Sequence, residues 1–373
     1  MDRADITTPS MASATAQPLR LSWRHPAGLL GLSTTNYVLR IITLGVYNFW
    51  GKTEVRKRIW SSIRIEGEPL QYTGTGRELF LGFLVVFGAV VIPVMIVSVV
   101  AALVLDPESA AFDAFQLVLY AAFFFLTGIA IYRAQRYRLS RTRWRGIRGS
   151  LIGSGHTYAW TYFWTGLLIP LTAGWIVPWR SAKLQGLMTR DMRFGDRPLQ
   201  FTASSGPLYG RFAILWVGAV AIVLLVAAAA AVAMGTELAN FDPSAGRAFA
   251  PSSRATAVVL ATLALAYILF SIASAWYRAH QINHFAAHTQ FDKACFKGCV
   301  TAGGLVWIGI TNILIVLLTL GLLVPVAQAR ATRYLIEHLE ITGRVALSEI
   351  AQAADQGIGR GEGLAQAFDI DAF

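Results

Sequence analysis

The stretch "ITLGVYNFWGKTEVRKRIW", residues 42–60, joins an apolar segment to a basic one through Thr-Leu-Gly and an aromatic pair. Two further stretches share this order: "LTAGWIVPWRSAKLQGLM" begins at Leu171 and "LTLGLLVPVAQARATRYL" begins at Leu318. A glycine after a β-branched threonine weakens a helix, and the prolines of the second and third stretches remove backbone donors. The pattern therefore predicts, at three places in the chain, a break between an apolar helix and a basic segment.

The composition indicates a membrane protein. Hydrophobic residues make up 55% of the 373 residues and charged residues only 14%, against about 25% charged residues in ordinary soluble domains. So many apolar side chains do not fit in one globular core. Four runs have the roughly 17–25 residues that a helix needs to cross hydrocarbon: Leu79–Leu105, Phe115–Tyr132, Phe212–Met234 and Ala257–Tyr277.

The net charge of +11 comes from 32 Lys and Arg against 21 Asp and Glu. These cations lie in loops beside apolar runs, where they set topology and contact anionic lipid. We therefore expect the phospholipid bilayer, with its anionic inner leaflet, as a partner. Nucleic acid is not expected, since no zinc-finger, RNP or helix-turn-helix pattern stands out. Residues 1–17 have no apolar h-region of a signal peptide, and we expect a short disordered arm.

An internal repeat organises the chain. Thr43, Gly45 and Trp50 match Thr172, Gly174 and Trp179 at one constant offset. The third copy keeps Thr319 and Gly321 but has Val326 in place of the tryptophan. The predicted units are a first membrane unit at 18–156, a second at 157–300, a third junction segment at 301–345 and a tail at 346–373.

The segments after the breaks suggest cytoplasmic structure. In "GKTEVRKRIWSSIR" the apolar Val55, Ile59 and Ile63 recur at i, i+4 and i+8 among basic residues, which predicts an interfacial amphipathic helix. "IRIEGEPLQYTG" then alternates apolar and polar residues around Gly67-Glu68-Pro69. This alternation predicts a short β-hairpin outside the membrane.

Two topologies compete. If seven apolar segments all crossed, loops 133–156 and 180–207 would face opposite sides of the membrane. Yet these loops carry seven and five Lys and Arg, and the positive-inside rule places both in the cytoplasm. The conflict disappears if segments 28–50, 157–179 and 301–327 enter from the cytoplasm and return, which leaves four spans. Seven ordinary spans with one exceptional loop remain the alternative.

The sequence thus predicts an all-α polytopic membrane protein. We expect a pseudo-repeat helical bundle with broken or re-entrant segments and small β-hairpins on the cytoplasmic face. The expected location is a bacterial inner membrane, with the basic loops and the C-terminus in the cytoplasm.

Several motifs together resemble one known family. The spacing N-x₆-TLG-x₄-W before basic residues, then "EGEPLQYTGTGRELFLGF" and the closing "GEGLAQAFDIDAF", are similar to the YjgN-like family of bacterial inner-membrane proteins. The resemblance covers about residues 18–373. It implies a multi-pass inner-membrane protein and implies no activity, because the family is a domain of unknown function.

Two groups of polar residues are candidates for chemistry. His280, His284 and His288 share a helix face, and Cys295 and Cys299 follow them. Together these five side chains could bind zinc or copper. The alternative is that the histidines belong to a polar cytoplasmic helix. We assign no metal or cofactor to them. Arg40 lies inside the first junction segment, where an ionisable residue marks a pathway or extends its charge to the head groups.

Enzymatic motifs do not stand out: there is no Walker A, G-x-S-x-G or H-E-x-x-H sequence. We therefore expect no enzyme. Basic residues beside aromatics could cradle lipid head groups or simply anchor the protein; these are Trp50, Arg56, Arg58, Trp60, Trp144 and Arg145.

Two functions follow from these patterns. Repeat-built membrane proteins often place a site between their halves beside broken helices, which favours transport of an apolar or amphipathic solute. The candidate binding residues are Thr43, Gly45, Trp50, Thr172, Gly174, Trp179, Thr319, Gly321 and Arg40. The alternative is a non-transporting scaffold or lipid-organising protein whose acidic C-terminal tail recruits a cytoplasmic partner.

Overall fold

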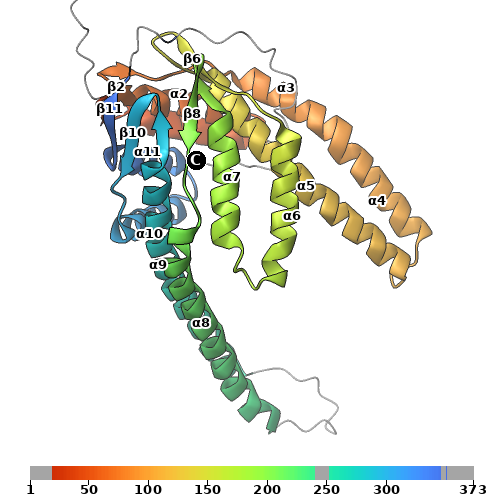
Figure 1. Cartoon of the computed structure of the whole chain (residues 1–373). Helices are drawn as coiled ribbons and strands as arrows, with labels where there is room; N and C mark the ends of the chain where they lie inside the picture. The colour runs from red at the N-terminus through yellow and green to blue at the C-terminus, as the bar shows by residue number, and fades with distance from the viewer. Residues whose placement is uncertain (1–18, 240–251, 346–349, 351–373) are drawn as a thin grey trace, which may run out of the picture.

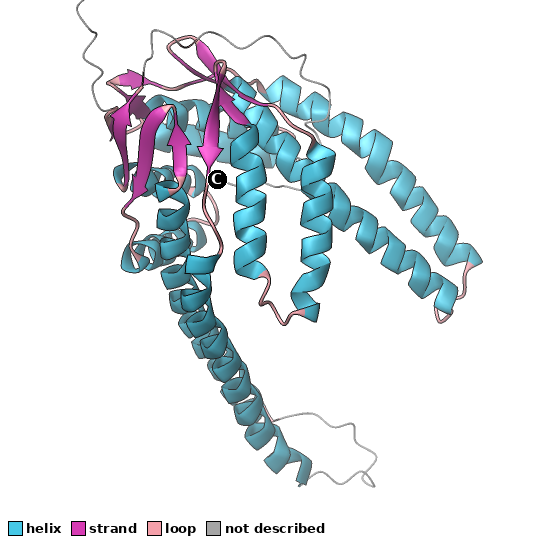
Figure 2. Ribbon diagram, viewed as in Figure 1, coloured by secondary structure: helices cyan, strands magenta, loops and turns pink. Residues whose placement is uncertain are grey.

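Strands and helical segments alternate along the chain in a regular order (Figures 1 and 2). The computed structural model describes residues 19–239, 252–345 and 350. The expected disordered arm, most of the expected tail and the middle of the loop 236–256 lie outside these described residues.

Antiparallel strands form one long meander. An eight-stranded sheet has the order β11-β10-β9-β8-β7-β6-β5-β4, and a three-stranded sheet has the order β1-β2-β3. β3 and β4 follow each other directly and join the two sheets, and β1 contacts β11. The strands are β1 (Leu21–Trp23), β2 (Ile63–Ile65), β3 (Glu68–Pro69), β4 (Gln71–Tyr72), β5 (Thr142–Trp144), β6 (Ile147–Leu151), β7 (Met192–Phe194), β8 (Arg197–Phe201), β9 (Thr289–Phe291), β10 (Lys293–Gly298) and β11 (Leu339–Arg344).

Five helical excursions leave this sheet. Three of them are pairs of shorter helices, called here the first, second and third hairpins: α1 (Leu29–Ile42) with α2 (Asn48–Ser62), α6 (Gly155–Leu171) with α7 (Val177–Asp191), and α10 (Ala302–Leu318) with α11 (Val324–Glu337). The other two are long helix pairs: α3 (Gly76–Val86), η1 (Phe87–Val91) and α4 (Ile92–Val104) with α5 (Ala110–Arg141), and α8 (Gly206–Ala239) with α9 (Ser253–Ala287). Figure 1 shows the two long pairs diverging from each other, with α6 and α7 between them.

Each excursion begins and ends on two strands that pair with each other. β6 precedes the second hairpin and β7 follows it, and their residues pair as Gly149↔Phe194, Ser150↔Arg193 and Leu151↔Met192. β1 and β2 flank the first hairpin in the same way, and β10 and β11 flank the third. β4 pairs with β5, and β8 with β9, across the two long pairs. Every helical excursion therefore returns to the sheet that it left.

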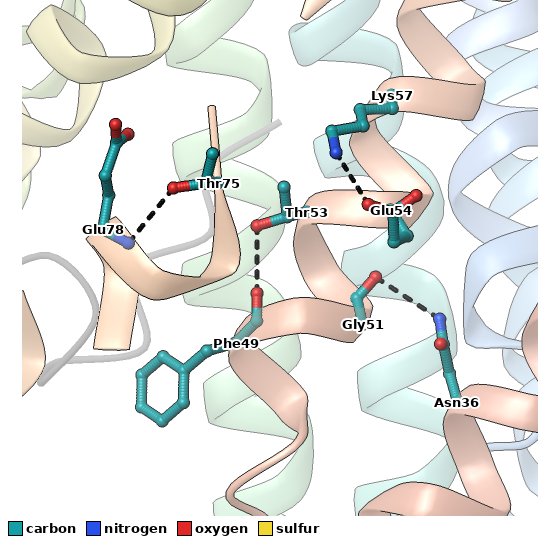
Figure 3. Close-up of polar contacts among 8 residues, drawn as sticks. All are labelled: Asn36, Phe49, Gly51, Thr53, Glu54, Lys57, Thr75 and Glu78. Carbon is teal, nitrogen blue, oxygen red and sulfur yellow. Dashed lines mark hydrogen bonds and ion pairs between the residues drawn. The ribbon is translucent and has the colours of Figure 1, made fainter. Parts of the chain in front are cut away.

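Hydroxyl side chains start many of these helices. Thr75, Ser109, Ser154, Ser252 and Thr301 are N-caps whose side-chain oxygens accept a backbone N–H three residues later. Figure 3 shows the Thr75 cap, where Oγ1 accepts from Glu78 N at 3.3 Å. Because such caps satisfy free N–H groups of the first turn, they fix where these helices begin.

Among the described residues, four helical segments are long and apolar enough to cross a membrane, as expected of a multi-pass membrane protein. They are Gly76–Val104, Ala110–Arg141, Gly206–Ala239 and Ser253–Ala287. They contain the four apolar runs found in the sequence, except that Leu105 follows the first segment as its C-cap. The first contains the π-helical turn η1 just before Pro93, because proline cannot donate the next helical hydrogen bond.

Apolar clusters pack the hairpins against neighbouring elements. The first and third hairpins share an apolar cluster of Leu29, Val55, Ile59 and Ala329. The second hairpin packs on α5 through Tyr132, Tyr158 and Leu184, and Tyr132 Oη donates to Asp191 Oδ2 at 2.6 Å. A further cluster inside the meander contains Phe291, Ala294, Val345 and Ile350.

The strands differ from the small separate hairpins that the sequence predicted. The first turn lies at Glu66 and Gly67, with φ of 52° and 78°, one residue earlier than expected. Arg145 and Gly146 repeat this geometry between β5 and β6. Such two-residue turns match the twist of antiparallel strands. The larger difference is that strands far apart in the sequence pair with one another, which no local alternation can indicate.

Gly76→Ala tests how closely α2 packs on α3. A Cβ at Gly76 would lie 2.7 Å from Trp50 Cα, which is backbone and cannot yield easily. We expect the free energy of unfolding to fall by about 1–3 kcal/mol, as for an overpacked core. Thermal unfolding of the purified protein in detergent measures this.

The matched control is Gly31→Ala in α1, where an added Cβ meets nothing within 4 Å. Here the free energy of unfolding should rise by up to about 1 kcal/mol, because alanine is the better helix former. Equal effects of the two substitutions would contradict the close α2–α3 contact.

Candidate functional site

The three junction threonines cap the first helix of each hairpin. Thr43 is the C-cap of α1, where its Oγ1 donates to Leu39 O at 2.7 Å and accepts from Tyr47 N at 2.9 Å. Thr172 and Thr319 make the same two bonds, at 2.8 and 3.3 Å and at 2.6 and 3.2 Å. Each hydroxyl thus links the end of one helix to the chain entering the next.

A Schellman motif turns the chain after each threonine. Leu44 and Gly45 have φ of 48° and 92°. Leu44 N donates to Ile41 O at 3.1 Å, and Gly45 N donates to Arg40 O at 2.8 Å. Gly174 and Gly321 donate in the same way. The motif satisfies carbonyls that a helix end leaves free, and glycine at this position accepts a positive φ without steric cost.

The hairpin tips are apolar on the outside. Leu44 is 94% exposed and Leu320 82% exposed. A turn whose backbone groups bond internally and whose side chains are apolar suits a hydrocarbon environment, where unsatisfied backbone groups are costly.

The junction tryptophans have different surroundings. Trp50 packs against Phe80 of α3, with ring centroids 5.5 Å apart. Trp179 is 42% exposed on α7. At the matching place in the third hairpin, Val326 packs between the first and third hairpins against the cluster that contains Leu29. The missing third tryptophan therefore coincides with a position that faces protein.

Asparagines hold two of the hairpins together. Asn36 Nδ2 of α1 donates to Gly51 O of α2 at 3.3 Å, and Figure 3 shows the two groups facing each other. Asn312 Nδ2 makes the matching bond to Ala327 O at 3.0 Å. In the second hairpin the matching residue is Thr165, whose Oγ1 donates within its own helix, to Thr161 O at 2.6 Å.

A basic cavity, called here chamber A, lies between α2, α5 and α11. Its volume is about 260 Å³. Lys52 and Arg56 lie one turn apart on α2, and Arg138 faces the same cavity from α5. The remaining wall combines apolar side chains with amides and hydroxyls: Ile59, Trp60, Ile63, Gln135, Leu139, Thr142, Gln328, Thr332 and Leu335. Chamber A thus offers positive charge, hydrogen-bonding groups and an apolar surface together.

A second cavity, called here chamber B, lies between the first and third hairpins. It has a volume of about 280 Å³ and adjoins chamber A at Lys52 and Gln328, which line both. Its other lining residues are Ser33, Asn36, Tyr37, Arg40, Asn48, Gly51, Val55, Gly321, Leu322, Val324 and Pro325. Chamber B therefore lies between the wall that it shares with chamber A and the turn of the third hairpin.

The structure brings only some of the predicted site residues together. Arg40 and Gly321 line chamber B. The three threonines lie at three separate tips, and their hydroxyls bond to backbone groups. Neither chamber is lined by Trp50 or Trp179.

Sequence reasoning pointed to Arg56 and Trp60, because cations beside aromatics suggest lipid contact. It missed Lys52, Arg138 and Gln328. The local signal was weak, since Arg138 and Gln328 reach chamber A only through the packing of α5 and α11 beside α2.

Two of the three histidines of the candidate metal group form hydrogen bonds to backbone carbonyls. His284 Nε2 donates to Ser204 O at 2.9 Å, and His288 Nδ1 donates to His284 O at 2.8 Å. Cys295 lies on β10 and Cys299 just after it, exposed. Within residues 19–239, 252–345 and 350, no group of three or more His, Cys, Asp or Glu side chains could hold a metal ion.

Comparison with known proteins identifies the family. A family model described as bacterial protein of unknown function (DUF898) matches residues 27–367. The chain belongs to this family. It is also 36% identical over 52 residues to the inner membrane protein YjgN of Salmonella typhimurium, a match that covers 14% of this chain and 13% of that protein. No solved structure matches the chain. The resemblance predicted from the junction motifs is confirmed.

Thr43→Val tests the threonine cap that ends the first helix of each hairpin. Valine keeps the branched shape but loses both hydrogen bonds and leaves Tyr47 N without the hydroxyl. We expect the free energy of unfolding to fall by about 1–3 kcal/mol, measured by thermal unfolding in detergent.

Thr34→Val is the control in the same helix. Thr34 is exposed and its hydroxyl makes a single bond, to Leu30 O at 3.2 Å. Its replacement should change the free energy of unfolding by less than about 0.5 kcal/mol. If Thr34→Val lowers the free energy of unfolding as much as Thr43→Val does, the two hydrogen bonds of the cap add no particular stability.

Proposed function

We propose that this protein is a multi-pass protein of a bacterial inner membrane that binds anionic lipid head groups at the cytoplasmic interface. The four candidate spans and the partial similarity to an inner membrane protein support the location. The basic loops support an orientation with the sheet in the cytoplasm, by the positive-inside rule.

The proposed topology has four spans and three re-entrant hairpins. Support comes from the strand pairing: α6 and α7 begin and end beside β6 and β7, which pair directly, so both ends lie at one sheet. α6, with 17 residues, is about 26 Å long, shorter than the roughly 30 Å of hydrocarbon. The chain is then two repeat units plus a final junction.

Chamber A is the observation that carries the functional proposal. Its cations lie on two different helices, with Lys52 and Arg56 on α2 and Arg138 on α5. Arginine binds phosphate oxygens with two parallel hydrogen bonds, and lysine adds a point charge. Trp60 and Leu139 line the same cavity and offer apolar contact to a glycerol or acyl segment. An anionic amphiphile offers a group that complements each of these three features.

The cation pattern distinguishes α2 from the other basic helices. At the positions that match Lys52 and Arg56, α7 has Ser181 and Gln185, and α11 has Gln328 and Thr332. Simple anchoring to an anionic leaflet requires no particular arrangement of cations. A pair of cations that line one cavity supports a defined binding site.

The proposed role is binding rather than catalysis. It develops the lipid-organising alternative, in which a cytoplasmic protein partner could also be recruited by the tail. Solute transport between the repeat halves calls for a polar cavity between the two long helix pairs. Chamber A borders only the first long pair, at α5, and chamber B borders neither long pair. The two long pairs also diverge (Figure 1), so head-group binding accounts better for these cavities.

Arg56→Gln tests the site. The full chain is reconstituted in lipid discs of phosphatidylethanolamine with a minor fraction of phosphatidylglycerol, and the retained phosphatidylglycerol is counted by native mass spectrometry. Loss of one charge-assisted contact, worth about 1.5–3 kcal/mol, should weaken retention about tenfold or more.

Lys183→Gln is the matched control. Lys183 is an exposed cation on α7, the helix that occupies the place of α2 in the second hairpin. It removes the same charge outside chamber A and should change retention by less than about twofold, as exposed charges contribute little. Equal losses from both substitutions would indicate general attraction to the leaflet and would refute the site.

A further inference from the structure

The first hairpin carries a polar stripe. Ser33, Asn36, Tyr37 and Arg40 occupy positions i, i+3, i+4 and i+7 of α1 and therefore share one face. All four line chamber B. The rest of α1 is mostly apolar, so this stripe runs down one side of a helix whose tip exposes Ile41, Ile42 and Leu44.

The other two hairpins lack this cation. The positions that match the stripe hold Tyr162, Thr165, Gly166 and Ile169 in α6, and Gly309, Asn312, Ile313 and Val316 in α10. The stripe is thus a property of the first hairpin alone and is not needed to form the shared turn. An arginine beside a membrane-embedded tip is costly, and such residues usually serve a function.

The opposite wall of chamber B belongs to the third hairpin. Gly321 and Leu322 come from its turn, and Pro325 and Gln328 from α11. At its other end chamber B meets chamber A at Lys52 and Gln328. Cations therefore occur from the hairpin tips inward, in the order Arg40, Lys52 and Arg56.

We propose that chambers A and B form one lateral path by which the phosphate-bearing head group of an inner-leaflet lipid enters from the membrane between the tips of the first and third hairpins. Arg40 contacts the phosphate first, and Lys52, Arg56 and Arg138 hold it in chamber A. This inference rests on the proposed head-group binding and adds the route and the source of the ligand.

The surroundings of the path favour a lipid over a soluble anion. Leu44 and Leu320, at the tips of the two hairpins that enclose chamber B, are the most exposed apolar residues there. A ligand whose acyl chains remain among such side chains while its phosphate moves along the stripe keeps its apolar part out of water.

Leu322→Trp offers a way to fill the path. The matching residue is Trp175 in the second hairpin and Val46 in the first. The turn therefore already accepts a tryptophan at this position in another copy. Val46→Trp is the control, since Val46 is half exposed and lines neither chamber.

The experiment uses two probes that share one head group. The full chain in phosphatidylethanolamine discs is exposed either to phosphatidylglycerol with a diazirine in its head group or to the same head group as a water-soluble glycerophosphate. Light-induced labelling of α2 and α5 peptides is quantified by mass spectrometry. Monodisperse elution of each variant confirms that it is folded.

We expect Arg40→Gln and Leu322→Trp each to lower labelling by the lipid probe about tenfold, as for loss of a charged contact. Labelling by the soluble probe should be unchanged. Arg56→Gln should lower labelling by both probes, and Val46→Trp should lower neither.

Other outcomes separate the route from the site. If Arg56→Gln lowers lipid labelling while Arg40→Gln and Leu322→Trp leave it unchanged, the path is refuted and head-group binding stands. If only the soluble probe labels the wild-type chain, the ligand is a soluble anion and both the path and the lipid assignment are overturned. If neither probe labels α2 or α5, the proposed function fails together with the path.

Discussion

Strand pairing across each helical excursion is the constraint on which the rest of the structure depends. β6 and β7 hydrogen-bond to each other although the two helices of the second hairpin separate them, and four other strand pairs close the other excursions in the same way. A segment whose two ends are tied to one sheet returns to the side on which it began. The short hairpins, the long helix pairs and the basic chamber beside α2 and α11 all follow from this closure.

Much of the local structure could be predicted from the sequence. The long apolar runs marked the four candidate spans, and the Thr-x-Gly pattern marked where α1, α6 and α10 end, because glycine and the threonine hydroxyl act on their own turn. The pairing of β1 with β2 or of β10 with β11 could not be predicted. These strands are three to six residues long, and their register depends on helices that separate them in sequence.

The candidate site was harder to predict for the same reason. Arg40 stood out because it is a cation in an apolar segment, and it does line a chamber. Thr43, Thr172 and Thr319 stood out because they recur, but recurrence reflected a shared turn, in which each hydroxyl bonds to backbone. Arg138 and Gln328 carry no local signal, since they meet Lys52 only when α5 and α11 pack beside α2.

Sidedness of the second hairpin tests the central claim most directly. Single cysteines replace three exposed residues in a Cys295→Ser, Cys299→Ser background: Glu108→Cys in the loop between α4 and α5, Arg145→Cys in the β5–β6 turn, and Lys183→Cys on α7. A membrane-impermeant thiol reagent is applied to intact and to permeabilised cells. The account predicts that Glu108→Cys reacts in intact cells, while Arg145→Cys and Lys183→Cys react only after permeabilisation. Reaction of Lys183→Cys in intact cells, with Arg145→Cys still protected, would show that α6 crosses the membrane and would contradict the return of the hairpin to its sheet.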